Sequence, residues 1–269
     1  MTDEVRSIRG ESFGATADLY DRARPDYPAT AITWLLGESP VRVVDLGAGT
    51  GILTRQLAAL GHEVVAVEPD SAMLERLRVR APGLEMHIGS AERIPLPDAS
   101  VDAVLAGQAY HWFDRTRAPR EIARVLRPGG VLGPIWNTWD DNDPWVAELI
   151  AIASLDTGPM SVVGDSGHAL DFGRKFTDVE HCSFKHAKTY TVDTLLDLIR
   201  STSPYRAHSE SKQNKIDHAV RKFIVGDDVP LRKWEIPYRA DAFRARNSGR
   251  RLPLRILRRV SRGTGKGVR

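Results

Sequence analysis

Three glycines stand at alternate positions in the segment Asp45-Leu46-Gly47-Ala48-Gly49-Thr50-Gly51. The residues just before it, 41–44, are mostly β-branched and predict a buried strand. Glycine lets the backbone turn sharply and approach a ligand closely, and a helix that begins behind the turn offers N–H groups without helical partners. We therefore expect a ligand to bind at this strand–turn–helix junction.

A second acidic residue stands where the next apolar run ends. Glu68 follows the run 64–67 and lies 23 residues after Asp45. A carboxylate at the end of the second strand of a βαβ unit can accept hydrogen bonds from both hydroxyls of a ribose. The alternative is an ordinary tight turn beside a surface acid, but the order of strand, turn, helix, strand and acid favours a nucleoside site.

The spacing of the glycines narrows the choice of nucleoside. A dinucleotide site needs Gly-x-Gly-x-x-Gly, and the sixth residue counted from Gly47 is Ile52. Counted from Gly49 it is Thr54, so neither count ends on glycine, and the Gly-Lys-Ser/Thr of a P-loop is absent. Asp45 would repel a pyrophosphate but attract an α-amino group. The pattern indicates a nucleoside that carries an amino acid, which is S-adenosylmethionine (AdoMet).

Apolar strand patterns alternate with amphipathic helices as far as Trp136. Strands are expected at 41–44, 64–67, 84–88, 101–106 and 131–136, and helices at about 50–60, from Asp70 or Ser71 onward, and at 119–126. Further on, 179–191 has strand character, 192–201 has a helical repeat and 233–246 alternates as an antiparallel strand would. Repeated βα units predict an α/β fold with a parallel sheet covered by helices on both faces.

The glycine segment resembles the first motif of the class I AdoMet-dependent methyltransferases. Further segments resemble later motifs in the same order: Val67-Glu68-Pro69-Asp70 for the ribose, Gly89-Ser90-Ala91-Glu92 with Pro95-Leu96-Pro97 for the adenine, Val101-Asp102-Ala103-Val104 and Gly107 to Phe113 for the fourth strand, and Leu126-Arg127-Pro128-Gly129-Gly130 for the turn before the fifth. The resemblance covers about 13–136 and is to the small-molecule type 11 branch. His111-Trp112-Phe113 resembles the trans-aconitate methyltransferase group.

This resemblance implies a Rossmann-like, seven-stranded, mostly parallel sheet in the order 3-2-1-4-5-7-6, with 233–246 as the antiparallel seventh strand. Residues 1–247 are then one AdoMet-binding domain, with a lid (1–35), a core (36–136) and an acceptor side (137–247). Gly133-Pro134 falls inside the fifth strand. Proline lacks the N–H that a central strand needs, so this strand is expected to be bent or short.

The resemblance also implies roles for individual residues. Asp45, Gly47, Gly49 and Gly51 would hold the methionine end, Glu68 the ribose, Ala91 and Glu92 the adenine, and Gln108 the pocket floor near the sulfonium. Tyr20, Arg24 and Tyr27 of the lid would either close over AdoMet or belong to an N-terminal helix packed by its aromatic residues. Many relatives carry an acid at the position of Ser90. A strong hydrogen bond to adenine is therefore not expected from this residue.

The methyl acceptor is less well determined. His111 either acts as a general base, orients the acceptor or packs at the sheet edge, and packing is preferred for Trp112 and Phe113. Arg24 suits either the carboxylate of AdoMet or an acidic acceptor. A carboxylate acceptor needs no base, whereas a hydroxyl or an amine does. We expect a methyltransferase acting on a small-molecule acceptor, with a carboxylate as the candidate class.

The net charge of +3 is unevenly distributed. Residues 248–269 carry eight basic residues and no acid, whereas 1–247 carry 30 basic and 35 acidic residues. An acidic body argues against a nucleic-acid groove on the folded part. The tail is expected to be flexible and dispensable for AdoMet binding, either as a solvated extension or as a weak contact with anionic lipid.

Other features of the sequence limit the classes of protein to which the chain could belong. Cys182 is the single cysteine, no signal-peptide pattern or long apolar run is present, and the histidines show no metal-ligand spacing. We expect a cytoplasmic enzyme without metal, and the sequence gives no indication of its oligomeric state. Two alternatives remain open: an AdoMet-binding regulator without catalysis, and a nucleic-acid methyltransferase that uses the tail. Against the second, the Asn/Asp-Pro-Pro-aromatic motif after the fourth strand and a Pro-Cys nucleophile are both absent.

Overall fold

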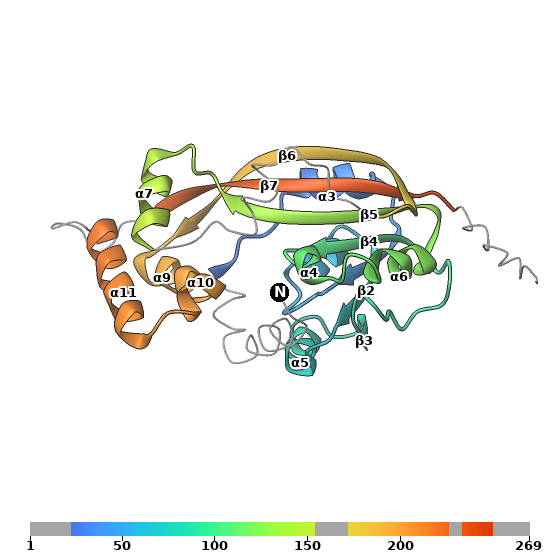
Figure 1. Ribbon diagram of the computed structural model, residues 1–269, viewed down its shortest axis with the longest axis horizontal. Coiled ribbons are helices and arrows are strands. Elements are labelled where there is room, and N and C mark those ends of the chain that lie inside the picture. The colour runs from blue at the N-terminus through green and yellow to red at the C-terminus, as the bar shows by residue number, and fades with distance from the viewer. Residues whose placement is uncertain (1–22, 154–171, 226–232, 250–269) are drawn as a thin grey trace, which may run out of the picture.

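The computed structural model describes residues 23–153, 172–225 and 233–249, which form a seven-stranded sheet (Figure 1). The strands are β1 (Arg42–Leu46), β2 (Glu63–Glu68), β3 (Glu85–Ile88), β4 (Val101–Gly107), β5 (Leu126–Trp139), β6 (Phe176–Tyr190) and β7 (Trp234–Asn247). Their order is β3-β2-β1-β4-β5-β7-β6; β1 to β5 pair in parallel, and β7 is antiparallel to both β5 and β6. The expected Rossmann-like fold and strand order are confirmed.

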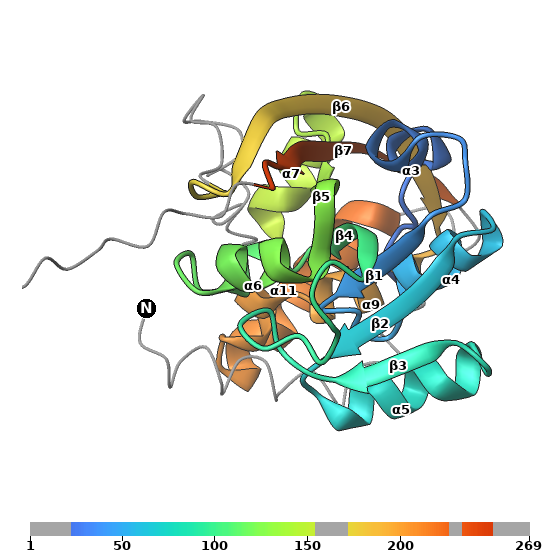
Figure 2. The same cartoon turned by 90° about the vertical axis from the view of Figure 1, so that its right-hand side faces the viewer.

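Helices cover both faces of the parallel part of the sheet. Those described are α3 (Ala29–Leu36), α4 (Ile52–Ala59), α5 (Ser71–Arg80), α6 (Ala118–Val125), α7 (Pro144–Ile152), α9 (Val192–Arg200), α10 (Ser203–Arg206), α11 (Glu210–Val225) and the 3₁₀ turn η2 (Tyr110–Trp112). Figure 2 shows α3, α4 and α5 on one face and α6 on the other. Because neighbouring strand residues point to opposite faces, Val43 packs with Leu35 and Leu57, whereas Val44 packs with Ile122.

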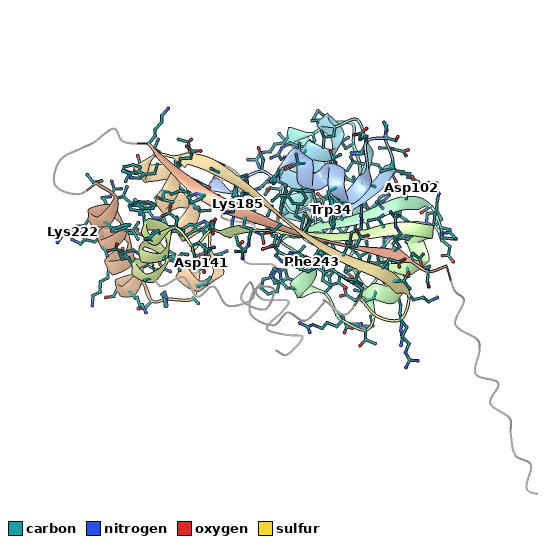
Figure 3. The ribbon with its side chains drawn as sticks, turned by 90° about the horizontal axis from the view of Figure 1, so that it is seen from above. Trp34, Asp102, Asp141, Lys185, Lys222 and Phe243 are labelled. Atoms are coloured by element: carbon teal, nitrogen blue, oxygen red, sulfur yellow. The ribbon has the colours of Figure 1, made fainter. Side chains whose placement is uncertain are left out.

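The three C-terminal strands of the sheet extend well beyond its parallel part. They carry a second group of helices, α7, α9, α10 and α11, whose apolar side chains share a core with β6 and β7 (Figure 1). Figure 3 views the sheet from above, with Lys222 of α11 at one end and Asp102 of β4 at the other. The helical repeat at 192–201 predicted α9, but no sequence pattern indicated α7 or α11. Tyr205 is buried in this core and donates to Asp217 (2.9 Å).

The prediction that β5 is bent or short is wrong. β5 runs for 14 residues, and its register with β7 is the same on both sides of Gly133-Pro134. Gly133 is needed there for packing, because a Cβ at this position would collide with Leu105 and press on Leu35 of α3. The missing proline N–H thus costs one ladder hydrogen bond without ending the strand.

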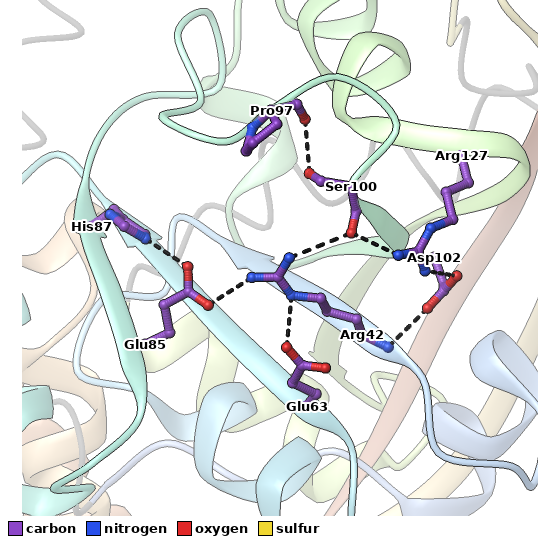
Figure 4. A network of polar contacts seen from close by, with 8 residues as sticks. All are labelled: Arg42, Glu63, Glu85, His87, Pro97, Ser100, Asp102 and Arg127. Atoms are coloured by element: carbon purple, nitrogen blue, oxygen red, sulfur yellow. Dashed lines mark hydrogen bonds and ion pairs between the residues drawn. The ribbon is translucent and has the colours of Figure 1, made fainter.

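The ends of the strands opposite the glycine turn are joined by charged side chains (Figure 4). Arg42 of β1 contacts Glu63 of β2 (2.8 Å) and Glu85 of β3 (2.7 Å). Its backbone N–H donates to Asp102 of β4 (3.0 Å), which is also paired with Arg127. Four adjacent strands are therefore held in register at this edge.

Two expectations concern residues near the chain ends. Tyr20 and residues 250–269, the greater part of the basic tail, lie outside the described residues. The start of the tail is described: Ser248 N donates to Lys175 O (2.8 Å). No helix within the described ranges is long and apolar enough to cross a lipid bilayer.

Candidate active site

A cavity of about 660 Å³ opens at the carboxyl ends of β1, β2 and β4. It is lined by Tyr27, Asp45, Gly47, Ala48, Gly49, Thr50, Ile52, Leu53, Glu68, Pro69, Asp70, Met73, Gly89, Ser90, Ala91, Glu92, Gly107, Gln108, Ala109, Trp112, Phe113, Asp114 and Arg117. This is the edge at which open α/β sheets bind their ligands. Its volume lies in the range of ordinary small-molecule sites.

The glycine turn forms one wall of the cavity. Gly47 and Gly49 have φ values of +73° and +56°, which glycine adopts without steric cost. A Cβ on Gly47 would lie 2.8 Å from Cβ of Ala109, so any larger residue would force the turn or the segment around Ala109 to shift. Gly51 has a different position from the predicted one. It precedes α4 as the N-cap, packs against Leu77 and does not line the cavity.

Asp45 lies at the base of this wall. Its side chain is 1% exposed and accepts a hydrogen bond of 2.6 Å from Thr54 of α4. Burial raises the pKa of Asp45 to about 7, and the nearby carboxylate of Glu68 adds to the shift. A cation placed in the cavity would favour the ionised form, which fits the predicted role at the amino group of a methionine moiety.

Glu68 ends β2 and is held by the backbone on two sides. Its carboxylate accepts from Gly49 N (2.9 Å) and from Asp70 N (3.0 Å), and its side chain is largely buried. Burial raises its pKa, while the two N–H donors act in the opposite direction. The carboxylate therefore braces the glycine turn and faces the cavity where a ribose was predicted.

The opposite wall joins two loops. Ala91 and Glu92 line it as predicted, and Glu92 accepts from Asp114 N (2.8 Å) in the segment after η2. Phe113 packs against Tyr110 at the sheet edge, as the preference for packing predicted, and Trp112 and Phe113 also line the cavity. Their position directly after β4, at the carboxyl edge of the sheet, was the signal that could have identified them.

Gln108 forms the floor of the cavity in a constrained conformation. Its φ is +54°, which is uncommon for a residue other than glycine. Its backbone N–H donates to Ile135 O (2.9 Å) and its side-chain amide donates to Asn137 O (2.7 Å), both on β5. Two hydrogen bonds to the neighbouring strand thus fix Gln108, the residue predicted to form the floor.

His111 lies beside the cavity wall but does not line the cavity. Its Nδ1 accepts a hydrogen bond from Nε1 of Trp136 (3.2 Å), so the ring proton belongs on Nε2. Burial and then the positive charge of Arg24 lower the pKa of His111 to about 4. A neutral ring whose Nδ1 is occupied is a poor general base at neutral pH and a suitable hydrogen-bond donor. The geometry favours the orienting role over the base role.

The lid residues behave differently from one another. Tyr27 lines the cavity, and a Cβ on Gly107 would lie 2.7 Å from its hydroxyl oxygen, so the ring rests directly on that glycine. Arg24 does not line the cavity, but its charge also lowers the pKa values of Tyr190 and Tyr238, against the dominant effect of burial. It therefore lies between the parallel part of the sheet and the second group of helices.

The residues fit a nucleoside that carries a charged amino acid. The glycine cradle admits a ligand close to the backbone, and two buried acids face the cavity. No group of three metal-ligating side chains occurs in the part of the chain that the structure describes.

Comparisons with known proteins agree with this geometry. A family model described as a methyltransferase domain matches residues 44–133. An uncharacterized methyltransferase of Mycobacterium tuberculosis (strain ATCC 25618 / H37Rv) is 46% identical over 192 residues, which is 71% of this chain and 76% of that protein. A malonyl-[acyl-carrier protein] O-methyltransferase of Methylococcus capsulatus is 40% identical over 142 residues, 49% of this chain and 51% of that one. A solved structure assigned to the type II methyltransferases, from Anaeromyxobacter dehalogenans, has a TM-score of 0.63 and 29% identity and covers 84% of this chain and 98% of its own.

Proposed function

The chain belongs to the methyltransferase domain family and uses AdoMet, and from this premise we propose that it transfers the methyl group to a carboxylate oxygen of a small acidic molecule. The cavity supplies the cofactor site, with Asp45 at the methionine end, Glu68 at the ribose and Ala91 and Glu92 along the adenine. The acceptor would approach from the side of Gln108. That side faces the second group of helices, to which we assign acceptor recognition.

One observation carries the proposal: the positive charge of Arg24 acts on the imidazole of His111, which is partly buried and neutral. Arg24 contributes to the low pKa of His111, so its charge acts at the ring, and the ring stays neutral at pH 7. A positive field favours an anionic acceptor. A neutral histidine with an occupied Nδ1 cannot readily remove a proton from a hydroxyl or an amine. Both properties suit a carboxylate, which arrives already deprotonated.

The reaction places modest demands on the protein. AdoMet supplies a methyl group that its sulfonium has already activated. A carboxylate oxygen forms a bond to the methyl carbon while the carbon–sulfur bond breaks with its electrons going to sulfur, which yields a methyl ester and S-adenosylhomocysteine and leaves no proton to be removed. The chain has to align the acceptor and exclude water. We assign charge pairing to Arg24 and hydrogen-bond donation from Nε2 to His111.

Two similarities support this choice of acceptor. The Methylococcus capsulatus relative is named as an O-methyltransferase of a malonyl group, and a malonyl group ends in a carboxylate. The triplet His111-Trp112-Phe113 resembles that of the trans-aconitate methyltransferase group, whose acceptors are small acids. We therefore also propose that the chain belongs to the trans-aconitate methyltransferase group.

A panel of acceptors tests the proposal directly. Wild-type protein is incubated with methyl-labelled AdoMet and one acceptor at a time. The acceptors are small mono-, di- and tricarboxylic acids, the corresponding amides as controls, phenols and amines. The expected product is a methyl ester that releases labelled methanol in mild alkali. Label transferred only to phenols or amines, in an alkali-stable form, would exclude carboxylate methylation.

Arg24→Ala then separates the acceptor from the cofactor. It is expected to raise the acceptor KM by at least tenfold, as loss of a charge-assisted hydrogen bond does, and to change the AdoMet KM by less than twofold. Arg117→Ala, which alters an arginine at the mouth of the cofactor cavity, is the control and should leave the acceptor KM unchanged. Equal increases in both KM values for Arg24→Ala would place Arg24 at the cofactor instead.

A further inference from the structure

Residues 23–27, which we call the N-terminal strap, cross between the two groups of helices on their way to α3. Figure 1 shows this segment starting beside α10 and rising to α3. The strap belongs to no strand of the sheet, so its backbone carbonyls need other partners. In the described structure each of its five carbonyls accepts a hydrogen bond from a side chain.

The donors come from three elements. The bonds run from Tyr190 to Ala23 O (2.9 Å), from Lys188 to Arg24 O (2.7 Å), from Asn137 to Pro25 O (3.3 Å) and Asp26 O (3.1 Å), and from Gln56 to Tyr27 O (2.8 Å). The side-chain oxygen of Gln56 also accepts from Tyr27 N (2.8 Å). A segment whose five successive carbonyls are held by side chains has little freedom to move, although it makes no ladder with the sheet.

Asn137 joins the strap to the floor of the cofactor cavity. Its backbone carbonyl receives the amide of Gln108, and its own amide nitrogen binds the strap. The remaining oxygen accepts from Nε2 of His186 on β6 (2.9 Å). All three polar groups that Asn137 presents here are used, and the residue is 5% exposed. One buried side chain thus fixes the position of the strap relative to Gln108.

Tyr190 anchors the other end of the strap through a chain of buried donors. Trp139 donates to the hydroxyl of Tyr238 (2.9 Å), and the two tyrosine hydroxyls are 2.8 Å apart. Because the proton of Tyr190 is given to Ala23, the proton between the two tyrosines must come from Tyr238. The chain of donors therefore runs from Trp139 through both tyrosines to the strap, and its last hydrogen bond is the one from Tyr190 to Ala23 O.

The strap carries two residues of the candidate site. Tyr27 rests on Gly107 in the cavity, and Arg24 places its charge near His111. Neither Asn137 nor Tyr190 lines the cavity. We propose that Asn137 and Tyr190 are positioning residues for AdoMet, because they lock the N-terminal strap and thereby hold Tyr27 against the cofactor. The inference concerns the cofactor and does not depend on the nature of the acceptor.

Two tyrosine variants of the full chain form a matched test. Tyr190→Phe removes the hydroxyl that binds the strap, and Tyr238→Phe removes the neighbouring hydroxyl of the same chain of donors. Both residues are almost fully buried, so the two variants should lower the melting temperature by similar amounts. The dissociation constant of S-adenosylhomocysteine, measured by calorimetry, should rise about fivefold for Tyr190→Phe, the effect of one buried hydrogen bond. For Tyr238→Phe it should stay within twofold.

Two asparagine variants form the second test. Asn247 of β7 is 6% exposed and donates to Ala123 O (3.0 Å), Leu126 O (3.1 Å) and Arg127 O (3.4 Å), far from the cavity. Asn137→Asp and Asn247→Asp each turn a buried donor into an acceptor that faces carbonyl oxygens. Asn137→Asp should weaken S-adenosylhomocysteine binding at least tenfold and speed amide hydrogen exchange of 23–32. Asn247→Asp should change neither.

The proposal is wrong if Tyr190→Phe keeps the wild-type affinity for S-adenosylhomocysteine. It is also wrong if each control variant weakens binding as much as the variant with which it is paired. The tyrosine pair removes only one oxygen atom per variant, so it decides the matter even if Asn137→Asp prevents folding.

Discussion

The hydroxyl of Thr54 lies 2.6 Å from a carboxylate oxygen of Asp45, and both side chains are buried under the glycine turn. This single side-chain donor does not offset the loss of water around the carboxylate, because burial dominates and the pKa of Asp45 rises to about 7. The ionised form of a fixed, poorly solvated carboxyl group is stabilised when a cation binds beside it. We expect Asp45 to lower the stability of the protein at neutral pH and to raise its affinity for AdoMet.

The first prediction concerns Asp45→Asn. A carboxyl group with a raised pKa binds its proton more tightly in the folded state, so the stability it contributes is present below about pH 4 and is lost as the pH rises through 7. Asparagine carries no charge to desolvate. The melting temperature of the variant relative to wild type should therefore increase from pH 4 to pH 8, while AdoMet affinity falls at least tenfold.

Asp241→Asn provides the control for this prediction. Asp241 is also buried, but it accepts bonds from Ser183 (2.7 Å) and Arg239 (3.0 Å), so its charge is paired. This substitution should lower the melting temperature at neutral pH and leave S-adenosylhomocysteine affinity intact. If Asp45→Asn were instead destabilising by the same amount at every pH, the account of Asp45 as a poorly solvated carboxyl would be wrong.

The second prediction concerns the pH dependence of cofactor binding. With a pKa of about 7, Asp45 is partly protonated at neutral pH before the cofactor binds. An amino group placed beside it would favour the ionised form, so AdoMet binding should release a proton and tighten as the pH rises from 5 to 8. Calorimetry in buffers of different ionisation enthalpy measures this release. Equal heats in all buffers at pH 6 would contradict it.

The strands could be predicted because each rests on local signals, whereas their order was implied by the family resemblance. A β-branched run followed by a glycine turn is visible over a few residues, and the βα repeat determines the sense of the sheet. Asp45 and Glu68 follow from their position at strand ends. Both are now seen to face one cavity.

The rest depends on contacts between segments far apart in the chain. Gly133-Pro134 predicted a bent or short strand, but β5 continues through both residues and keeps its register with β7. The strap is bound by side chains more than 100 residues away in sequence, such as Asn137 and Tyr190, and no local pattern indicates such a partner. The same limit applies to His111, whose protonation depends on Trp136 and Arg24.

The third prediction concerns the charged edge of the sheet in Figure 4. Arg42→Met removes the guanidinium from Glu63 and Glu85 but keeps the aliphatic stem. The free energy of unfolding should fall by about 1 kcal/mol, since the side chain is partly exposed and solvent screens the pairs. The loss should shrink at high salt and at acid pH, where Glu85, whose pKa is lowered by His87 and Arg42, becomes protonated.

Cofactor affinity tests whether Arg42 affects the cavity at the opposite ends of the strands. Arg42 lies at the amino ends of the strands and the cavity at their carboxyl ends, so Arg42→Met should leave the dissociation constant of S-adenosylhomocysteine unchanged. Chemical denaturation at low and high salt measures the stability, and calorimetry the binding. A loss of affinity without loss of stability would show that the two edges are coupled.

The last prediction tests whether Gly51 of the glycine turn contributes to packing or to binding of the methionine end. Gly51 has φ +88°, and a Cβ there would collide with Leu77 of α5, whereas Gly61 has φ +86° and open space around it. Gly51→Ala combines backbone strain with overpacking and should lower the free energy of unfolding by about 3 kcal/mol, against about 1 kcal/mol for Gly61→Ala. Adding Leu77→Ala relieves only the collision, so the double variant should bind S-adenosylhomocysteine as wild type does. If the folded Gly51→Ala/Leu77→Ala protein still binds S-adenosylhomocysteine more weakly than wild type, Gly51 belongs to the methionine site, as the sequence motif predicted.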